Sequence, residues 1–127
     1  MAAFVFDTTV LIDHLRGHRP ALNFIKKVES GEMVGKISTL SITELYAGRN
    51  SRAEKKKDLI IRLLSLMEKI HVDEVVAERA GAIRREHGTR TTDAIIAATS
   101  MLSDSVLLTS NLKDFERIPG LNVKAPY

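Results

Sequence analysis

The sequence has no cysteine and no tryptophan, and aromatic residues make up only 5% of its positions. The absence of cysteine excludes a disulfide framework, a thiolate metal site and a thiol nucleophile. The scarcity of aromatic side chains argues against a platform on which bases stack, so any nucleic acid would be bound mainly through its phosphates. No apolar run approaches the roughly 18 residues of a membrane span, and no basic leader opens the chain. These absences lead us to expect an untargeted protein of the reducing cytoplasm.

The length of 127 residues is that of one domain, which can bury a core without covalent cross-links. We therefore expect a single domain over residues 1–127. The net charge of +3 is mild, but positive charge is concentrated between positions 49 and 57, where five basic residues accompany one acid. The bases are Arg49, Arg52, Lys55, Lys56 and Lys57. Such a segment can attract a polyanion, although most charged runs are simply solvated helix faces.

Residues 4–13, FVFDTTVLID, form the stretch around which the chain is organised. An apolar run rich in strand-forming residues ends at Asp7, and the apolar run after two threonines continues as a helix. Asp7 is therefore expected at the carboxyl end of a buried strand, which is where ligands bind in an open parallel sheet. An acid at this place can equally cap the helix that begins near Thr8, and the sequence leaves both roles open.

Strands and helices alternate along the rest of the chain. Helices are predicted at about 8–16, 20–30, 41–47, 58–69, 73–87 and 91–102, and strands at about 4–6, 33–37, 70–72 and 105–109. Ser41, Asp73 and either Thr91 or Thr92 are the predicted caps of three of these helices. Alternation of this kind is typical of a parallel α/β sheet covered by helices on both faces.

The segment from 58 to 70 carries a broad apolar face. Leu59, Ile60, Leu63, Leu64 and Met67 recur there at helical spacing. A face of this width suggests more than one packing partner, so we expect the helix to cover its own sheet on one side and a second subunit or another protein on the other. A role confined to the core of this chain is the alternative.

Four polar residues follow strands or open helices in the predicted order of elements. Asp7 and Asn111 come after strands, whereas Glu44 and Asp93 lie in the first turns of helices, where the helix dipole alone also favours an acid. In a parallel sheet all four can converge at one edge. Oxygen ligands without Lys or Arg beside them favour Mg²⁺ or Mn²⁺. Such a site can activate water and stabilise the charge that develops on a phosphodiester.

Four segments in the right order and spacing make the chain resemble a PIN domain, and specifically the toxin ribonucleases of VapBC toxin–antitoxin pairs. The segments are FDTTVLID at 6–13, SITELYAG at 41–48, TDAIIAAT at 92–99 and LLTSNLKDF at 107–115, followed by IPGL. The resemblance covers essentially the whole chain. It implies a Rossmann-like three-layer α/β/α sandwich with a central, mainly parallel sheet.

The resemblance also implies a function and the residues that carry it. The protein would be a Mg²⁺- or Mn²⁺-dependent endoribonuclease toxin, with RNA as its substrate and a small VapB-like antitoxin as its partner. Together with the broad apolar face, the resemblance also implies a homodimer. The metal-binding acids of the family fall on Asp7, Glu44 and Asp93, and its fourth catalytic position, which is often acidic, falls on Asn111.

Asn111 departs from the acidic pattern, which leaves the fourth ligand open. Asn111 can offer a carbonyl oxygen to a metal, or it can cap the following turn, with Asp114 three residues later completing a capping box. Asp114 can also approach the metal through a water. Thr9 and Thr109 match positions near the site that the family fills with small hydroxyl residues.

Other classes of protein fit parts of the sequence. FVFD followed by a threonine, together with LLTSN, echoes two motifs of haloacid-dehalogenase-like phosphatases, but only about 16 residues follow the second motif. That is too few for the lysine and the final acidic pair of that family. A receiver domain fails because the central aspartate and the paired leading acids are absent. A catalytically inactive PIN-like module that binds nucleic acid or protein stays open, because Asn111 replaces an acid.

Overall fold

The structure, a computed structural model, describes residues 1–48 and 53–127. In this part of the chain five strands form one parallel sheet, in the order β3-β2-β1-β4-β5. The strands are β1 (Ala3–Phe6), β2 (Val34–Ser38), β3 (Glu68–Ile70), β4 (Val106–Leu108) and β5 (Val123–Lys124). The helices are α1 (Thr8–Leu15), α2 (Arg19–Glu29), α3 (Thr39–Tyr46), α4 (Glu54–Leu66), α5 (Glu74–His87), α6 (Thr91–Leu102) and α7 (Leu112–Phe115). None of the described helices has the length and apolar character needed to cross a membrane.

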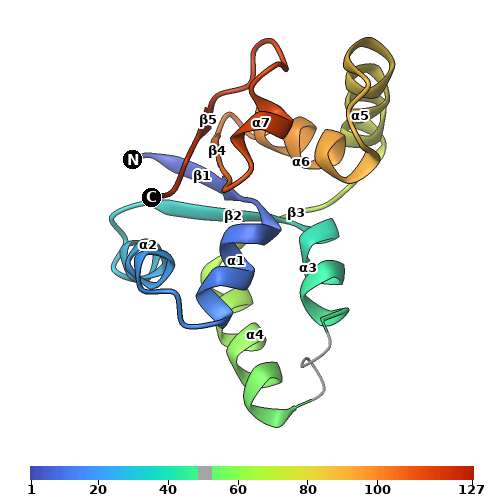
Figure 1. Cartoon of the computed structure of the whole chain (residues 1–127). Helices are drawn as coiled ribbons and strands as arrows, with labels where there is room; N and C mark the ends of the chain where they lie inside the picture. The colour runs from blue at the N-terminus through green and yellow to red at the C-terminus, as the bar shows by residue number, and fades with distance from the viewer. Residues whose placement is uncertain (49–52) are drawn as a thin grey trace.

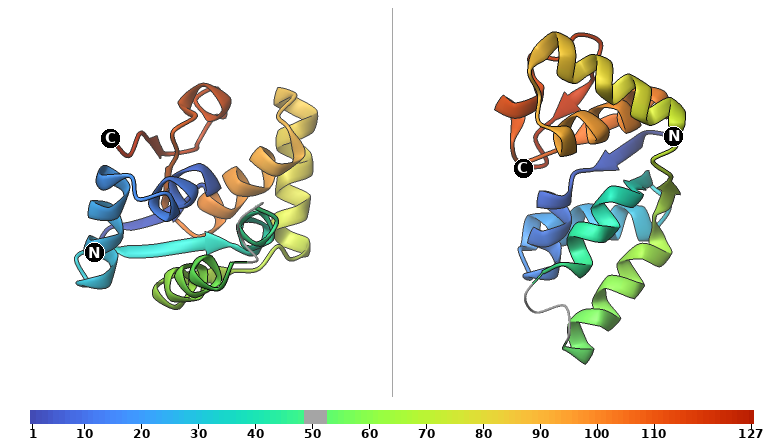
Figure 2. Two further views of the ribbon diagram at one scale, coloured as in Figure 1. Left: turned by 60° about the horizontal axis from the view of Figure 1, so that its bottom comes forward. Right: turned by 90° about the vertical axis from the view of Figure 1, so that its right-hand side faces the viewer.

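Alternate residues of β1 face opposite sides of the sheet, as the two-residue repeat of a strand requires. Phe4 and Phe6 point into one core with α1, α2 and α4, whereas Val5 points into a second core with α5 and α6. Figure 1 and Figure 2 show these two helical layers on either side of the sheet. The predicted Rossmann-like three-layer sandwich with a parallel central sheet is confirmed.

Strand β1 lies at the centre of the sheet and pairs with both β2 and β4. From β1 the chain first builds outward through β2 and β3, and then returns to place β4 and β5 on the other side. The order of the strands therefore reverses between β1 and β4, and open α/β sheets bind ligands in the crevice at such a reversal. Asp7 follows β1 and Thr109 follows β4 at this point.

The start of α3 differs from the prediction. Its cap is Ser38, whose Oγ accepts a hydrogen bond from the backbone N–H of Leu40 at 3.2 Å. Ser41, the predicted cap, is fully buried inside the helix. Several hydroxyl residues follow β2, and the helix begins at the first of them because Ser38 is also the last residue of the strand, paired with Ile70.

The starts of two other helices also depart from expectation. Helix α6 begins at Thr91, with Arg90 in the cap position and no capping side chain, so neither predicted threonine caps it. Helix α4 begins at Glu54, in the basic segment that precedes its predicted start. Asp73 does cap α5, because its Oδ1 accepts a hydrogen bond from the N–H of Val76 at 2.9 Å.

The broad apolar face of α4 packs mostly inside this chain. The core that contains Phe6 also buries Ile60, Leu63, Leu64 and Met67. Met67 is the C-cap residue, directly after the end of the helix. The structure thus supports the intramolecular role for these four side chains, whereas the remaining residue of the predicted face is only half-buried. A second subunit on this helix would contact residues other than these four.

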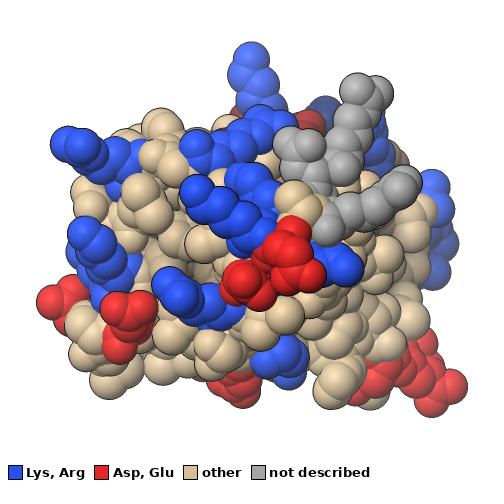
Figure 3. Space-filling view, turned by 90° about the horizontal axis from the view of Figure 1, so that it is seen from below, with Lys and Arg blue, Asp and Glu red and all other residues tan. Residues whose placement is uncertain are grey.

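The basic segment lies partly outside the described residues, which do not include Arg49 and Arg52. Lys55 and Lys57 are exposed in the first turns of α4, whereas Lys56 is half-buried and its Nζ donates to the carbonyl oxygen of Leu15 at 2.5 Å. Figure 3 shows Lys and Arg side chains spread over the face that lies at the bottom of Figure 1. The described lysines are therefore in part a solvated helix face and in part structural.

Gly35 of β2 allows close packing of the sheet against α2. A Cβ on Gly35 would lie 2.6 Å from the Sδ of Met67 and 3.1 Å from both Cγ atoms of Val28. Met67 can move, but Val28 is held in the core. We therefore expect Gly35→Ala to lower the free energy of unfolding by about 1–3 kcal/mol, the usual cost of overpacking a core. Urea denaturation followed by circular dichroism measures the change.

Gly81→Ala is the matched control for this substitution. Gly81 lies inside α5, and a Cβ there would meet nothing within 4 Å. The control is expected to raise the free energy of unfolding by about 0.5–1 kcal/mol, because alanine is the better helix former. Two variants of equal stability would contradict the packing role of Gly35.

Candidate active site

A cavity of about 240 Å³ lies beside the point where the strand order reverses between β1 and β4. Its walls come from the start of α1, the last turn of α3, the start of α6 and the segment after β4. Because α3 begins at Thr39, Glu44 lies in its last turn, and the prediction that Glu44 lies in the first turns of its helix is wrong. The lining residues are Asp7, Thr8, Thr9, Ile12, Glu44, Thr92, Asp93, Ile96 and Asn111. All four predicted catalytic residues therefore line one cavity, although they come from four separate parts of the sequence.

Asp7 is the most deeply buried acid of the cavity, with 6% of its surface exposed. Its Oδ1 accepts a hydrogen bond from the backbone N–H of Thr8 at 2.9 Å. Its Oδ2 accepts from the hydroxyls of Thr109 at 2.7 Å and of Thr9 at 3.1 Å. Asp7 therefore caps α1 and lines the cavity at the same time, and both threonines singled out in the sequence hold its carboxylate.

Glu44 is held by a residue that the sequence did not point to. The hydroxyl of Thr8 donates to the Oε1 of Glu44 at 2.7 Å, and the Thr8 oxygen also lies 2.9 Å from the Oγ of Ser41. Because Thr8 opens α1 while Ser41 and Glu44 lie on α3, these contacts join the two helices beside the cavity. The position of Thr8 directly after Asp7 is the one sign in the sequence that it lies near the site. No local pattern relates Thr8 to Ser41.

The acids are close enough to perturb one another. Burial raises the pKa of Asp7, the three hydrogen bonds to its carboxylate partly oppose this, and the charge of Glu44 adds to the increase. Burial also raises the pKa of Asp93, as do the charges of Asp114, Asp7 and Glu44, while Arg90 opposes them. Mutual repulsion of this kind costs stability in the absence of a cation.

Asn111 and Asp114 do not form the predicted capping box. Asn111 is in the cap position of α7, but its side chain makes no capping hydrogen bond, and its backbone N–H donates to the hydroxyl of Thr109 at 3.0 Å. In a capping box this N–H would donate to the carboxylate of Asp114, but here it donates to Thr109. The charge of Asp114 instead acts on Asp93, and both carboxylates line a second hollow. Capping is therefore the wrong interpretation of Asp114.

The donors of the cavity suit a hard divalent cation. Asp7, Glu44 and Asp93 offer carboxylate oxygens and Asn111 a carbonyl oxygen, and none of the described lining residues is Lys or Arg. In the described part of the chain, however, no three acids or histidines are close enough to form a metal-binding group, and hydroxyls already occupy oxygens of two of the acids. The residues fit such an ion by donor type and charge, but not as a preformed cluster.

Comparison with known proteins identifies the class. The protein-family model of the PIN domain matches residues 4–121, and the chain therefore belongs to the PIN-domain family. It is similar to Ribonuclease VapC19 of Mycobacterium tuberculosis (strain ATCC 25618 / H37Rv), with 31% identity over 129 aligned positions that cover 97% of this chain and 98% of the relative. Within the PIN domains, it is a member of the VapC group.

Other relatives agree with this assignment. The tRNA(fMet)-specific endonuclease VapC of Salmonella typhimurium is 26% identical and is aligned over 98% of both chains. A solved toxin–antitoxin complex from Klebsiella pneumoniae matches with a TM-score of 0.80 and 34% identity, covering 100% of this chain and 98% of the other. DNA-bound VapBC from Salmonella typhimurium matches over 100% of both chains with a TM-score of 0.85 and 24% identity, which supports the fold.

The raised pKa of Asp93 makes a prediction about stability and pH. A carboxyl whose folded pKa exceeds its ordinary value of 3.8 binds more protons in the folded state, so its cost to stability is present at neutral pH and disappears as the pH falls toward 3.8. Asp93→Asn, measured with a chelator present, should therefore raise the melting temperature at pH 7.5 by about 3 °C, for a gain of up to about 1 kcal/mol. The gain should shrink on acidification.

Glu74→Gln is the control for the loss of a first-turn acid. Glu74 occupies the first turn of α5 and is exposed, so its removal forfeits the favourable interaction with the helix dipole, up to about 1 kcal/mol, and relieves no repulsion. The control should melt at or slightly below the wild-type temperature. If Asp93→Asn melts no higher than the control, repulsion among the acids does not destabilise the metal-free protein.

Proposed function

We propose that this protein is a Mg²⁺- or Mn²⁺-dependent endoribonuclease that acts as the toxin of a toxin–antitoxin pair. The observation that carries the proposal is the meeting of three acids and Asn111 in one cavity, at the strand reversal of a PIN domain. Its relatives include proteins named as ribonucleases and solved toxin–antitoxin complexes. The substrate is RNA, cleaved at phosphodiester bonds.

In the proposed mechanism Asp7, Asp93 and Glu44 hold the cation. When bound, the ion activates water and offsets the negative charge that develops on the phosphodiester. The chain supplies positioning: Thr9 and Thr109 fix the carboxylate of Asp7 by two hydroxyl hydrogen bonds. Thr8 turns Glu44 toward the cavity, where Glu44 completes the acidic pocket and positions the attacking water.

The proposed partner is a small VapB-like antitoxin that covers apolar helical surface and blocks the acidic pocket. A groove of about 250 Å³ between α1, α2 and α4 offers such a surface. Leu22, Leu59 and Leu66 are its half-buried apolar residues, whereas Ile25 and Leu63, which also line it, are buried in the core. We also propose that the chain is a single domain, that it forms a homodimer, and that it acts in the cytoplasm, where its RNA substrate is found. Sedimentation of the isolated chain as a monomer at micromolar concentration would remove the dimer from the proposal.

Cleavage of RNA by the purified chain tests the enzymatic part. The protein should cut a single-stranded RNA in Mg²⁺ or Mn²⁺, lose this activity in EDTA and regain it when the metal is added back. It should not turn over a phosphomonoester, which a phosphatase would. RNA binding without cleavage under any divalent metal would instead identify the inactive binding module.

Growth of a host cell tests the toxin part. Expression of the chain alone should arrest growth, and co-expression of the adjacent short reading frame should restore it. An active-site variant such as Asp7→Asn, expressed to the same level, should leave growth normal. Normal growth with active wild-type protein and no partner would contradict the assignment as a toxin.

A further inference from the structure

A second hollow adjoins the acidic cavity and brings positive charge beside it. It has a volume of about 170 Å³, and its lining residues are His87, Gly88, Thr89, Arg90, Asp93, Asp114, Arg117 and Ile118. Asp93 lines both hollows, so the two meet at this carboxylate. The proposed mechanism gives no role to the two arginines.

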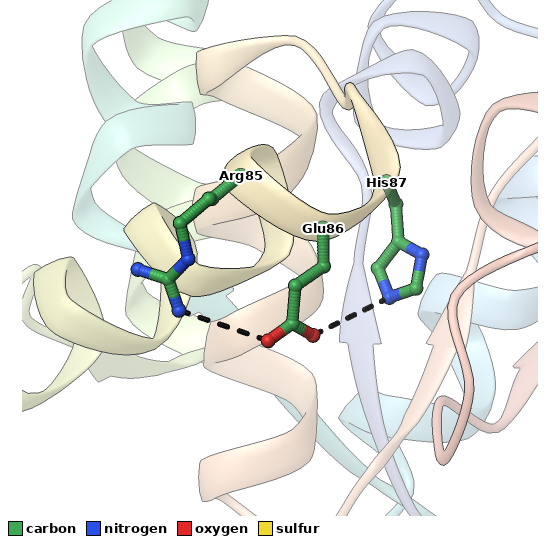
Figure 4. Close-up of polar contacts among 3 residues, drawn as sticks. All are labelled: Arg85, Glu86 and His87. Carbon is green, nitrogen blue, oxygen red and sulfur yellow. Dashed lines mark ion pairs between the residues drawn. The ribbon is translucent and has the colours of Figure 1, made fainter.

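Neither arginine is engaged in an ion pair within the described residues, and both are exposed at the hollow. The charged residues at the nearby end of α5, by contrast, are close to an opposite charge. There, Arg85 and His87 both approach the carboxylate of Glu86, at 3.7 and 3.9 Å (Figure 4). The guanidinium groups of Arg90 and Arg117 thus remain available to an anion.

The backbone holds both arginines in place at the hollow. Helix α5 ends at Gly88, whose φ of 66° permits the sharp turn before Arg90, and the Nε of Arg84 donates to the carbonyl oxygen of Thr89 at 3.1 Å. Arg117 directly precedes Ile118, which is buried and whose N–H donates to the carbonyl oxygen of Phe115 at 3.1 Å. Both guanidinium groups therefore extend from fixed points of the chain.

We propose that Arg90 and Arg117 bind a backbone phosphate of the RNA next to the bond that is cut, and so position the strand over the acidic cavity. This inference rests on the proposed ribonuclease function. The acids of the first cavity repel a polyanion, so a strand that enters it needs cations close by. A guanidinium group suits this task, because its planar array of donors can bind two phosphate oxygens at once.

The carboxylates in the hollow limit what can bind there. Asp93 and Asp114 offset the two arginines in the free protein, so free inorganic phosphate should bind only weakly. An RNA strand that also contacts the acidic cavity is favoured, because its neighbouring phosphate is delivered to the arginines at high local concentration.

RNA binding by variants of the two arginines tests the inference. Fluorescence anisotropy of a labelled single-stranded RNA is measured in an Asp7→Asn background, which prevents cleavage. Arg90→Gln and Arg117→Gln should each weaken binding about five- to tenfold and reduce the slope of log K against log salt concentration by about 0.7, the value for one phosphate contact of a single strand. Lysine at either position should retain part of the affinity, because it keeps the charge and loses the paired donors.

Arg79→Gln is the matched control, because Arg79 is an exposed residue of α5 outside the hollow. It removes the same charge and should change affinity by less than about twofold and leave the salt slope unchanged. In proteins that retain Asp7, Arg90→Gln and Arg117→Gln should raise KM about as much as they weaken binding, with kcat within about twofold of wild type. A purely structural role would lower the melting temperature instead.

Three results separate this inference from the proposed function. If the variants bind RNA as the Arg79→Gln control does, the inference is wrong. The inference is also wrong if the Arg90 and Arg117 variants bind RNA normally but bind the antitoxin more weakly. The hollow would then bind an acidic side chain of the antitoxin and not a phosphate of the RNA. If RNA binding depends on both arginines but the wild-type chain cleaves no RNA with any divalent metal, the phosphate subsite stands and the proposed catalytic function fails.

Discussion

Asp93→Asn is expected to reduce metal-dependent RNA cleavage by about a thousandfold or more, equivalent to ~4 kcal/mol of transition-state stabilisation. Asp93 lies in the first turn of α6, and its carboxylate reaches the cavity that Asp7 and Glu44 also line. Asparagine keeps the shape of the side chain but removes the charge that would hold the cation. A fluorogenic RNA assay under single-turnover conditions measures the loss.

Two further measurements make this result specific. The variant should fold, and with a chelator present it should melt above the wild-type temperature for the reason given with the site. Mn²⁺ should raise the melting temperature of the wild type but not that of the variant, because a ligand stabilises only the protein that binds it. Asp58→Asn removes an exposed acid of α4 that lies outside the cavity, and it should cleave at the wild-type rate.

Cleavage by Asp93→Asn at the wild-type rate, with unchanged dependence on metal, would contradict the assignment of Asp93 as a ligand. Loss of cleavage in Asp58→Asn as well would show that overall charge, and not the position of Asp93, controls the reaction. Loss of folding in Asp93→Asn would be visible in its melting curve and would contradict the expected gain in stability.

Asn111→Asp is expected to tighten the binding of Mn²⁺ by about ten- to a hundredfold. Asn111 lines the acidic cavity, and its side chain makes no capping hydrogen bond, so an aspartate there adds a carboxylate to the pocket at little cost to the fold. Ligand charge changes the affinity of hard cations over orders of magnitude. Isothermal titration of the purified variant measures the dissociation constant, and cleavage at low metal concentration should be equal or higher.

Asp114→Asn distinguishes the two candidates for the fourth position. Asp114 is exposed, does not cap α7 and acts on Asp93 through its charge. Its removal relieves the repulsion with Asp93, so with a chelator present the melting temperature should be equal to or slightly above that of the wild type. Mn²⁺ binding should weaken by a few-fold, the scale expected for a charge that does not contact the metal directly. If Asn111→Asp leaves the affinity unchanged while Asp114→Asn weakens it strongly, Asp114 is the fourth ligand and the assignment of Asn111 is wrong.

The layered fold and the common location of the acids were predictable from the sequence. Asp7 ends an apolar run, Asp93 lies in the first turn of a helix and Asn111 follows a buried strand. Glu44 instead lies in the last turn of α3, and not in its first turns as predicted. These boundaries appear in the local order of apolar, polar and helix-capping residues, and the alternation of elements implies a parallel sheet. Because the carboxyl ends of parallel strands meet at one edge, positions along the chain were enough to bring Asp7, Asp93 and Asn111 together. Glu44 joins them from the last turn of α3, where it accepts a hydrogen bond from Thr8.

Local pattern was not enough to choose among neighbouring polar residues. The end of β2 and the segment after it offer several hydroxyl side chains, and the one that caps α3 is Ser38, which ends the strand and pairs with Ile70 of β3. Asp114 has the spacing of a capping box, but the N–H that it would accept from is bonded to Thr109. Strand β5 was not predicted, because its two residues are too short to show a period.

The sequence by itself determined the class of fold and the common location of Asp7, Asp93 and Asn111, because both depend on where elements begin and end; it also singled out Glu44, but in the wrong turn of its helix. Only the tertiary structure decided which side chains support them. The contact of Thr8 with Ser41 spans 33 positions of sequence. Arg90 and Arg117 share one hollow although one precedes α6 and the other follows α7. Contacts of this kind depend on how helices cross and pack on the sheet, and a repeat of two or 3.6 residues carries no information about that geometry.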